Sequence, residues 1–210
     1  MTERSELTRL LINRECFSDM RIESSGPVPA ALDGEVVLAL DRFALTVNNI
    51  TYAAFGEALR YWDFFPSGID GWGQLPVWGY ADVVDSAVDG VEVGQRYFGY
   101  FPTATHLSVH PGNGGARGFR DGAPHRRSLP AVYNAYQRTD DDPFHDEASE
   151  PLHAIFRPLF VTAYGLADDL RERDFHGAER VVISSASSRT SYAAAFCIGQ
   201  LAGIETVGLT

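Results

Sequence analysis

The sequence predicts a mixed α/β fold in which a strand-rich barrel precedes a parallel β-α-β unit. In the first half, short runs of β-branched and aromatic residues alternate with turn residues. Residues 181–195 pass from an apolar strand, through small hydroxylated residues, to an Ala-rich helix, which is typical of a phosphate-binding turn. We place the domain boundary near Pro151, between residues 1–150 and 151–210.

The early elements follow from the positions of the apolar runs. Residues 1–14 are mainly polar, and residues 16–22 show only a weak strand pattern. Residues 36–47 are apolar at both odd and even positions. They therefore predict a strand covered on both faces and bent into a barrel, which ends in a turn at Asn48 and Asn49.

The remaining elements of the first half are short. We expect a helix over residues 51–60 and a glycine-rich loop over 68–73. Turn residues then separate three predicted strands, at residues 75–86, 91–101 and 105–109.

Residues 111–130 form a loop rich in glycine and arginine in a chain whose net charge is −11. Such a loop could hold an anionic substrate or a cofactor phosphate. We favour a solvated loop, or one that pairs with the acids at residues 140–142.

The second half predicts a helix over residues 152–173, with a break or a fresh start at Pro158. A strand, a helix and a second strand follow, at residues 180–184, 191–201 and 205–209. Together they make one β-α-β unit of about thirty residues, as a parallel nucleotide-binding sheet requires.

The turn before that helix lacks the glycines of a dinucleotide-binding fingerprint. Ala186, Ser188 and Ser191 occupy their positions, and each adds a Cβ where backbone should approach phosphate or strand. Hydroxyls and one guanidinium could bind phosphate instead, from Ser187, Ser188, Arg189 and Thr190. Alternatively, the serines only cap the helix.

Composition excludes several kinds of function. The acidic balance disfavours nonspecific binding to nucleic acid or to an anionic membrane, and no apolar stretch is long enough for a membrane span. The chain has no lysine, so it has no Schiff-base or P-loop lysine chemistry. An N-terminal apolar run too short for a secretory signal leads us to expect a cytoplasmic protein.

A metal site is not expected. Cys16 and Cys197 are far apart in apolar surroundings, which predicts two buried thiols rather than a disulfide or a zinc site. The six histidines have neither helical ligand spacing nor a neighbouring cysteine.

Five segments resemble the medium-chain dehydrogenase/reductase superfamily, especially its zinc-independent, quinone-oxidoreductase-like branch. They are residues 48–52, 75–79, 88–99, 160–164 and 180–210. The resemblance implies a GroES-like β-barrel followed by the first β-α-β of a Rossmann-type domain.

Other stretches, at residues 45–53, 125–136, 157–170 and 184–190, look more like an uncharacterised family of superfamily relatives. That family is known only as a domain of unknown function, so it implies no activity.

The superfamily resemblance implies an NADPH-dependent, metal-independent oxidoreductase that transfers hydride to a small carbonyl, enone or quinone. Tyr52, with Asn48 beside it, would polarise the substrate, Thr162 would contact the nicotinamide carboxamide, and the serine turn would hold the pyrophosphate. Tyr52 could equally be a barrel-core tyrosine.

The alternative function is a catalytically silent superfamily member that binds a metabolite or a partner. We expect a small-molecule substrate, with neither nucleic acid nor membrane as a partner, and leave a homo-oligomer open. Because a Rossmann-type domain needs strands beyond Thr210, we also expect either a C-terminally truncated chain or a sheet completed by another chain.

Overall fold

The structure is a computed structural model that describes residues 6–115 and 117–210. The chain divides into two compact units, Met1–Pro151 and Leu152–Thr210, which are described separately.

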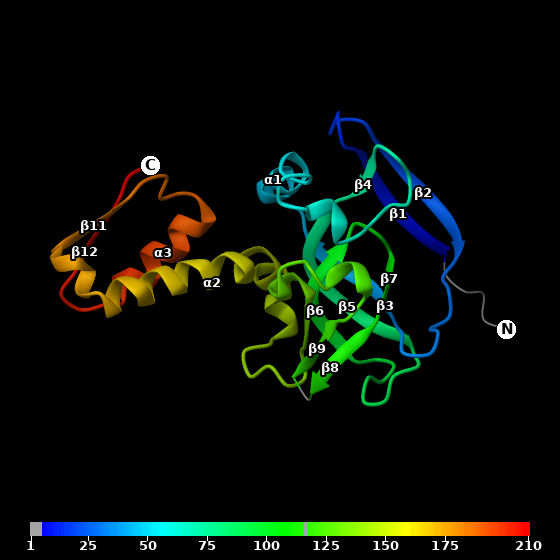
Figure 1. Ribbon diagram of the computed structural model, residues 1–210. Coiled ribbons are helices and arrows are strands. Elements are labelled where there is room, and N and C mark those ends of the chain that lie inside the picture. The colour runs from blue at the N-terminus through cyan, green and yellow to red at the C-terminus, as the bar shows by residue number, and fades with distance from the viewer. Residues whose placement is uncertain (1–5, 116) are drawn as a thin grey trace. The chain divides into compact units, whose positions relative to one another are not determined.

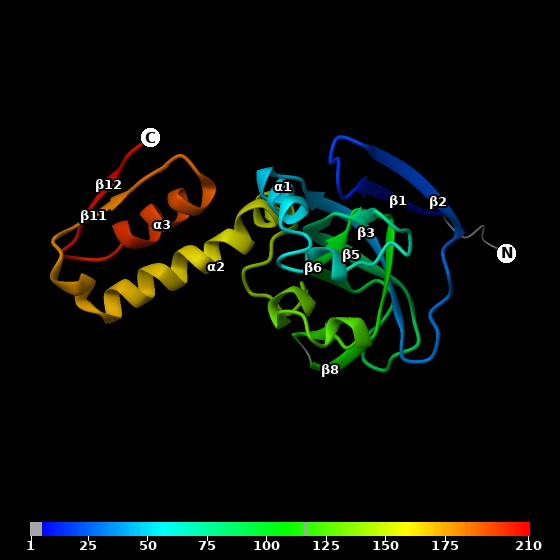
Figure 2. The same cartoon turned by 45° about the horizontal axis from the view of Figure 1, so that its top comes forward.

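The first unit contains a seven-stranded antiparallel sheet that curls into a nearly closed, barrel-like structure (Figures 1 and 2). In spatial order its strands are β7 (His106–Val109), β3 (Val36–Ala44), β5 (Pro76–Ser86), β6 (Arg96–Pro102), β10 (Ala135–Arg138), β9 (Gly118–Asp121) and β8 (Pro111–Gly115).

A three-stranded antiparallel sheet continues this unit. Its strands, in spatial order, are β2 (Met20–Pro27), β1 (Glu6–Asn13) and β4 (Trp72–Gln74). Backbone hydrogen bonds of 2.8 Å, from Leu10 N–H to the Thr103 carbonyl and from Thr105 N–H to the Thr8 carbonyl, join it to the barrel.

Helical elements complete the unit. They are the α-helix α1 (Val47–Ala54) and the 3₁₀ turns η1 (Tyr61–Asp63), η2 (Pro124–Arg126), η3 (Ala131–Asn134) and η4 (Glu147–Ser149).

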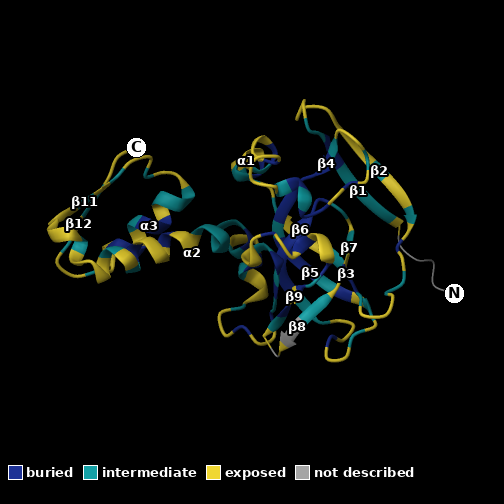
Figure 3. Cartoon of the chain, viewed as in Figure 1, coloured by how far each residue is buried: buried dark blue, intermediate teal, exposed yellow. Residues whose placement is uncertain are grey.

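The barrel core confirms the prediction of a strand covered on both faces. Val36, Val37 and Leu38 are consecutive in β3 and all fully buried, although neighbouring strand residues point to opposite faces. Val77 and Phe101 are equally buried on β5 and β6, and the buried residues concentrate in these central strands (Figure 3).

Several predictions for the N-terminal half are wrong. Residues 6–13 form β1, in which Leu11 and Ile12 are buried, and β2 begins only at Met20. Asn48 and Asn49 lie inside α1 rather than in a turn. The helix starts early because Asn49 Oδ1 accepts a hydrogen bond from Thr46 N–H at 2.6 Å.

The Gly/Arg-rich segment is not simply a solvated loop. Strands β8 and β9 pair in antiparallel fashion within this segment, and Arg126 is only 1% exposed. Arg126 pairs with Asp121 at 3.2 Å, whereas Arg138 pairs with two of the acids at residues 140–142. The solvated interpretation holds for Arg120 and Arg127, which are exposed.

The second unit confirms the predicted β-α-β. Strands β11 (Arg180–Ile183) and β12 (Glu205–Gly208) pair in parallel, and α3 (Arg189–Gly199) connects them. Figures 1 and 2 show α3 between this sheet and α2 (Glu150–Glu172). The 3₁₀ turn η5 (Asp174–Gly177) follows α2.

The predicted break at Pro158 is wrong, because α2 continues through it. A proline removes one backbone hydrogen bond from a helix interior. Buried Ala163 and Ala167 pack α2 against α3, and this packing offsets the loss.

Of the two predicted buried thiols, Cys197 is buried and Cys16 is exposed. Cys16 follows the end of β1, where the Cys16 and Glu15 N–H groups bond to Asn13 Oδ1, so it belongs to a surface turn rather than to an apolar strand. Among the described helices, none combines the length and the apolar character needed to cross a membrane.

An ion-pair network anchors the first residue of α2 to the barrel. Arg96 on β6 bonds to both carboxylate oxygens of fully buried Glu150 at 2.7 Å, and it also pairs with Asp82 on β5 and Asp41 on β3. His145 Nε2 lies 2.9 Å from Glu150. Burial alone would raise the pKa of Glu150, but the hydrogen bonds from Arg96 and His145 outweigh it and lower that pKa.

Replacing Glu150 with glutamine should lower the free energy of unfolding by about 2 kcal/mol near neutral pH, because weaker bonds to a neutral amide replace the charge-assisted hydrogen bonds from Arg96 to a buried carboxylate. Since the folded-state pKa of Glu150 is lowered, its ionisation stabilises the fold above the ordinary carboxyl pKa, and this contribution disappears as the pH falls. Urea unfolding between about pH 7 and pH 3 should therefore show a shallower loss for Glu150→Gln than for the native chain. Glu172→Gln, at an exposed position of the same helix, is the control, and parallel pH profiles for Glu150→Gln and the native chain would contradict the assignment.

Gly73→Ala should destabilise the first unit by about 1–3 kcal/mol. A Cβ at Gly73 would lie 2.4 Å from the ring of Trp62, which is only 2% exposed. Gly165→Ala is the contrasting variant, since open space surrounds that helical position, and it should stabilise by up to about 1 kcal/mol. Thermal unfolding distinguishes the two, and equal shifts would show that Trp62 accommodates the methyl group.

Candidate functional site

The turn between β11 and α3 is a tight backbone structure that presents a helix N-terminus. Ser185 has a φ of 50°, in the left-handed region that non-glycine residues adopt only at some energetic cost. Its carbonyl accepts a 2.8 Å hydrogen bond from Ser188 N–H. Ala186 N–H bonds to the Leu209 carbonyl at 2.9 Å, so the turn is tied to the strand beside it.

Three residues of this turn occupy positions where a dinucleotide-binding fingerprint has glycine. Two of them, Ser188 and Ser191, already use their hydroxyls in hydrogen bonds within the protein. Ser188 is the N-cap of α3, and its Oγ accepts from Ser191 N–H at 3.3 Å. Ser191 Oγ donates to the Ser184 carbonyl at 3.3 Å. The capping interpretation is therefore correct for Ser188, which is less available as a phosphate ligand.

Other groups at this helix end remain available. The N–H groups of Arg189 and Thr190 lie in the first helical turn, where no intrahelical acceptor exists. Within the described part of the chain, no hydrogen bond occupies the hydroxyls of Ser187 or Thr190, and no acid pairs with Arg189. These groups can receive an anion at the positive end of the helix dipole.

The missing turn glycine is compensated on the adjacent strand. A Cβ added at Gly208 in β12 would lie 2.8 Å from the Cβ of Ala186. Ala186 therefore fits its position only because residue 208 has no side chain. A search of the turn for the spacing of fingerprint glycines does not reveal that a glycine on the neighbouring strand makes space for Ala186.

Thr162 belongs to the same unit as the turn. It lies exposed on α2, and its neighbour Ala163 packs against Ala193 and Ala194 in the first half of α3. The described contacts give Thr162 no bond to the turn, so its predicted role stays a prediction.

Tyr52 and Asn48 lie on α1, four residues apart and hence on one face of the helix. Asn48 is the predicted site residue, but its neighbour Asn49 is the residue with a clear structural function. Asn49 is buried, caps α1 and donates from Nδ2 to the Pro76 carbonyl at 2.8 Å. Asn48 is half-buried and stays a candidate only.

An aromatic cluster surrounds Tyr52. Its ring lies 4.7 Å from that of Tyr61 and 5.7 Å from that of Tyr100, and Tyr133 lies 4.7 Å from Tyr100. Tyr100 is fully buried, whereas Tyr52, Tyr61 and Tyr133 are half-buried. Burial raises the pKa of Tyr52, so its hydroxyl stays protonated at neutral pH and can donate a hydrogen bond.

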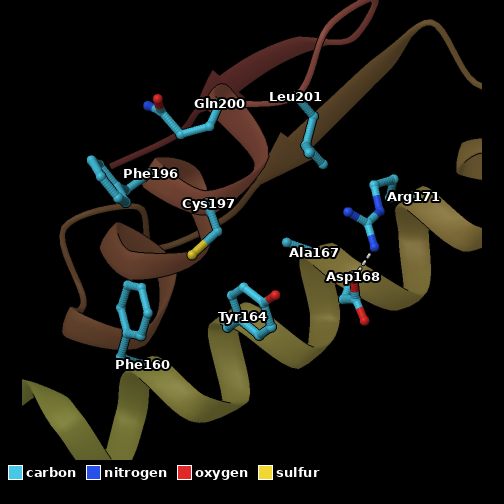
Figure 4. A pocket seen from close by; sticks show the side chains of 9 residues that line it. All are labelled: Phe160, Tyr164, Ala167, Asp168, Arg171, Phe196, Cys197, Gln200 and Leu201. Carbon is cyan, nitrogen blue, oxygen red and sulfur yellow. Dashed lines mark hydrogen bonds and ion pairs between the residues drawn. The ribbon is translucent and has the colours of Figure 1, made fainter. Parts of the chain in front are cut away.

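A cavity of about 240 Å³ lies between α2 and the C-terminal half of α3 (Figure 4). Phe160, Tyr164 and Phe196 give it mainly apolar walls. Burial raises the pKa of the Cys197 thiol in its wall, so the reactive thiolate form is disfavoured. This cavity lies at the opposite end of α3 from the serine turn, and Arg171 in its wall is already paired with Asp168.

No group of three or more histidine, cysteine, aspartate or glutamate side chains within residues 6–115 and 117–210 could hold a metal ion. Metal independence remains a prediction.

Ser188→Ala should lower stability by about 1 kcal/mol, because it removes the N-cap of α3. Ser187→Ala is the matched control, since that hydroxyl makes no capping bond, and it should change stability by less than about 0.5 kcal/mol. Chemical denaturation of both variants measures the difference. Equal losses would contradict the assignment of Ser188 as the cap.

Comparison with known proteins places the chain in a family context. The sequence model named DUF2855, described as a protein of unknown function, matches residues 43–210. A comparison with curated proteins finds no match.

Solved structures share the fold at low sequence identity. CurA of Vibrio vulnificus in complex with NADPH is 13% identical, with a TM-score of 0.56, and the match covers 96% of this chain and 51% of that one. A Mesorhizobium loti protein classed as an NADPH:quinone reductase is 14% identical, with a TM-score of 0.56 and coverages of 99% and 55%. The CurF ER cyclopropanase of the curacin A pathway is 16% identical, with a TM-score of 0.57 and coverages of 97% and 54%.

This chain thus spans about half the length of these structures. The likeness confirms the fold predicted from the superfamily resemblance, a GroES-like barrel followed by the first β-α-β of a Rossmann-type domain. At these identities it establishes the fold alone.

Proposed function

The chain belongs to the DUF2855 family, and we propose that it is an NADPH-dependent, metal-independent oxidoreductase acting on a small carbonyl, enone or quinone. The observation that carries the proposal is the helix N-terminus after β11, which has free N–H groups, two unoccupied hydroxyls and an unpaired arginine among the described residues. CurA of Vibrio vulnificus, which shares this fold, binds NADPH in its solved complex, and the Mesorhizobium loti protein of the same fold is described as an NADPH:quinone reductase.

The residues of the turn suit a pyrophosphate. Ser187 and Thr190 would donate their hydroxyls, and Arg189 would add a charge-assisted hydrogen bond. Serine and arginine side chains would here replace part of the backbone cradle that glycines provide elsewhere. Thr162 would hydrogen-bond the carboxamide of the nicotinamide.

NADPH, when bound, supplies the hydride. The chain's own contribution would be orientation and a hydrogen bond to the acceptor oxygen, donated by the protonated Tyr52 hydroxyl, with Asn48 beside it on the same face of α1. The half-buried rings around Tyr52 favour a flat, partly apolar substrate such as a quinone or an enone.

A second candidate is a catalytically silent member of the family that binds a metabolite or a partner. The hydroxyls of Ser188 and Ser191 already form hydrogen bonds at the start of α3. They are therefore less available to bind phosphate, which favours this candidate.

Titration calorimetry of the folded chain with NADPH should detect binding. Arg189→Ala should weaken it about 10- to 100-fold, because a charge-assisted hydrogen bond contributes roughly 1.5–3 kcal/mol. Arg171→Ala, at the far end of α2, is the matched control and should bind as the native chain does. The absence of heat at millimolar NADPH would exclude the proposed cofactor.

Tyr52→Phe should lower kcat for quinone or enone reduction about 100-fold while leaving NADPH binding unchanged, because it removes one donor to the reacting oxygen. Loss of NADPH absorbance across a panel of quinones and enones provides the measurement, with Tyr192→Phe as the control. NADPH binding without turnover of any panel member would favour the silent alternative.

A further inference from the structure

A second cavity, of about 220 Å³, lies wholly within the first unit, beside β1 and β7. Its wall combines apolar side chains, among them Phe65 and Leu107, with the two arginines Arg9 and Arg126. A small cavity of mainly apolar character with a few convergent polar groups is the usual form of a ligand site. Phe65 and Leu107 in this wall also pack against the aromatic cluster that contains Tyr52 and Tyr100.

Arg126 is the unusual residue of this cavity. It is 1% exposed, and its Nε lies 3.2 Å from Asp121 while Nη1 donates to the Tyr136 hydroxyl at 3.2 Å. Its guanidinium carbon lies 4.5 Å from the ring centre of Phe65. These contacts fix the orientation of the guanidinium group.

The remaining nitrogen of that group, Nη2, is buried and has no hydrogen-bond partner. A buried charged donor without an acceptor destabilises a folded protein. Such a donor therefore indicates either an ordered water or a ligand with acceptor oxygens. A guanidinium group matches the geometry of both carboxylates and phosphates, so an oxyanion is the acceptor that it recognises best.

The surrounding charges limit the ligand to a single negative charge. Asp121 forms an ion pair with Arg126 and accepts hydrogen bonds from the backbone N–H groups of His110 and Ala123. Arg9 pairs with Glu23 at 2.9 Å. Burial lowers the pKa of His106 in the wall, so this histidine is mainly neutral near pH 7. A dianion such as phosphate would find too little positive charge.

We propose that this cavity binds a small organic monocarboxylate, whose carboxylate accepts from Arg126 and whose apolar part lies against Phe65 and Leu107. The arginine-rich segment of the sequence would thus supply a ligand site through its one buried arginine rather than through a charged surface. The inference is independent of NADPH binding and of the proposed oxidoreductase activity.

Calorimetry of the full chain with sodium benzoate, in the absence of NADPH, tests the proposal. Benzoate should bind at least tenfold more tightly than benzamide, which has the same ring without the charge. Arg126→Met should reduce benzoate affinity at least tenfold, and Arg120→Met, an exposed arginine of the neighbouring hairpin, should leave it unchanged. Inorganic phosphate should bind more weakly than benzoate.

Because Arg126 also contacts Asp121 and Tyr136, its replacement could prevent folding. Ala104→Phe is therefore the second variant, since it adds a ring to the cavity wall without removing a charge, and it should block benzoate. Equal affinities for benzoate and benzamide, no benzoate binding at 10 mM, or benzoate binding that survives either folded variant would overturn the proposal. Arg189→Ala should bind benzoate normally, which separates this test from that of the cofactor.

Discussion

The ion pair between Arg96 and Glu150 is the constraint on which much of the first unit depends. It brings together an arginine on β6, aspartates on β3 and β5, and the first residue of α2. A fully buried carboxylate is tolerated only when its charge is paired and its oxygens are hydrogen-bonded, and Arg96 satisfies both oxygens. Because a buried Glu150 carboxylate needs Arg96 as its partner, this pair ties the start of the long helix to the central barrel strands.

In the second unit, small residues have a similar role. Ala163 on α2 packs against Ala193 and Ala194 on α3, which allows the two helices to approach closely. Small side chains also explain why Ala186 can occupy a turn position where dinucleotide-binding proteins have glycine. Gly208 on the neighbouring strand β12 has no side chain that would clash with the Cβ of Ala186. A turn can thus retain its backbone course after losing its glycines, provided that the compensating space lies elsewhere in the packing.

Sequence patterns correctly predicted the elements that are determined by residues close to one another in the chain. The β5 strand and the β-α-β unit were recognisable because apolar periodicity and turn residues define them within a few positions. The β1 strand was missed because its burial depends on partners distant in the chain. Arg126 could not be recognised as buried for a similar reason, since its environment comes from Phe65, Asp121 and Tyr136. The site residues were chosen by resemblance, and no pattern in the sequence revealed the rings that gather around Tyr52.

The two-stranded sheet of the second unit also has a consequence for how the chain opens. In the described part of the chain, β11 pairs only with β12, so each strand has a free edge whose backbone amide and carbonyl groups meet water. The inner barrel strands, in contrast, are paired on both sides and surround a buried core. Amide hydrogens of β11 and β12 should therefore exchange with solvent through local fluctuations that leave the barrel closed. The serine turn, where we propose that a pyrophosphate binds, directly follows β11, so a bound ligand should slow amide exchange in this sheet.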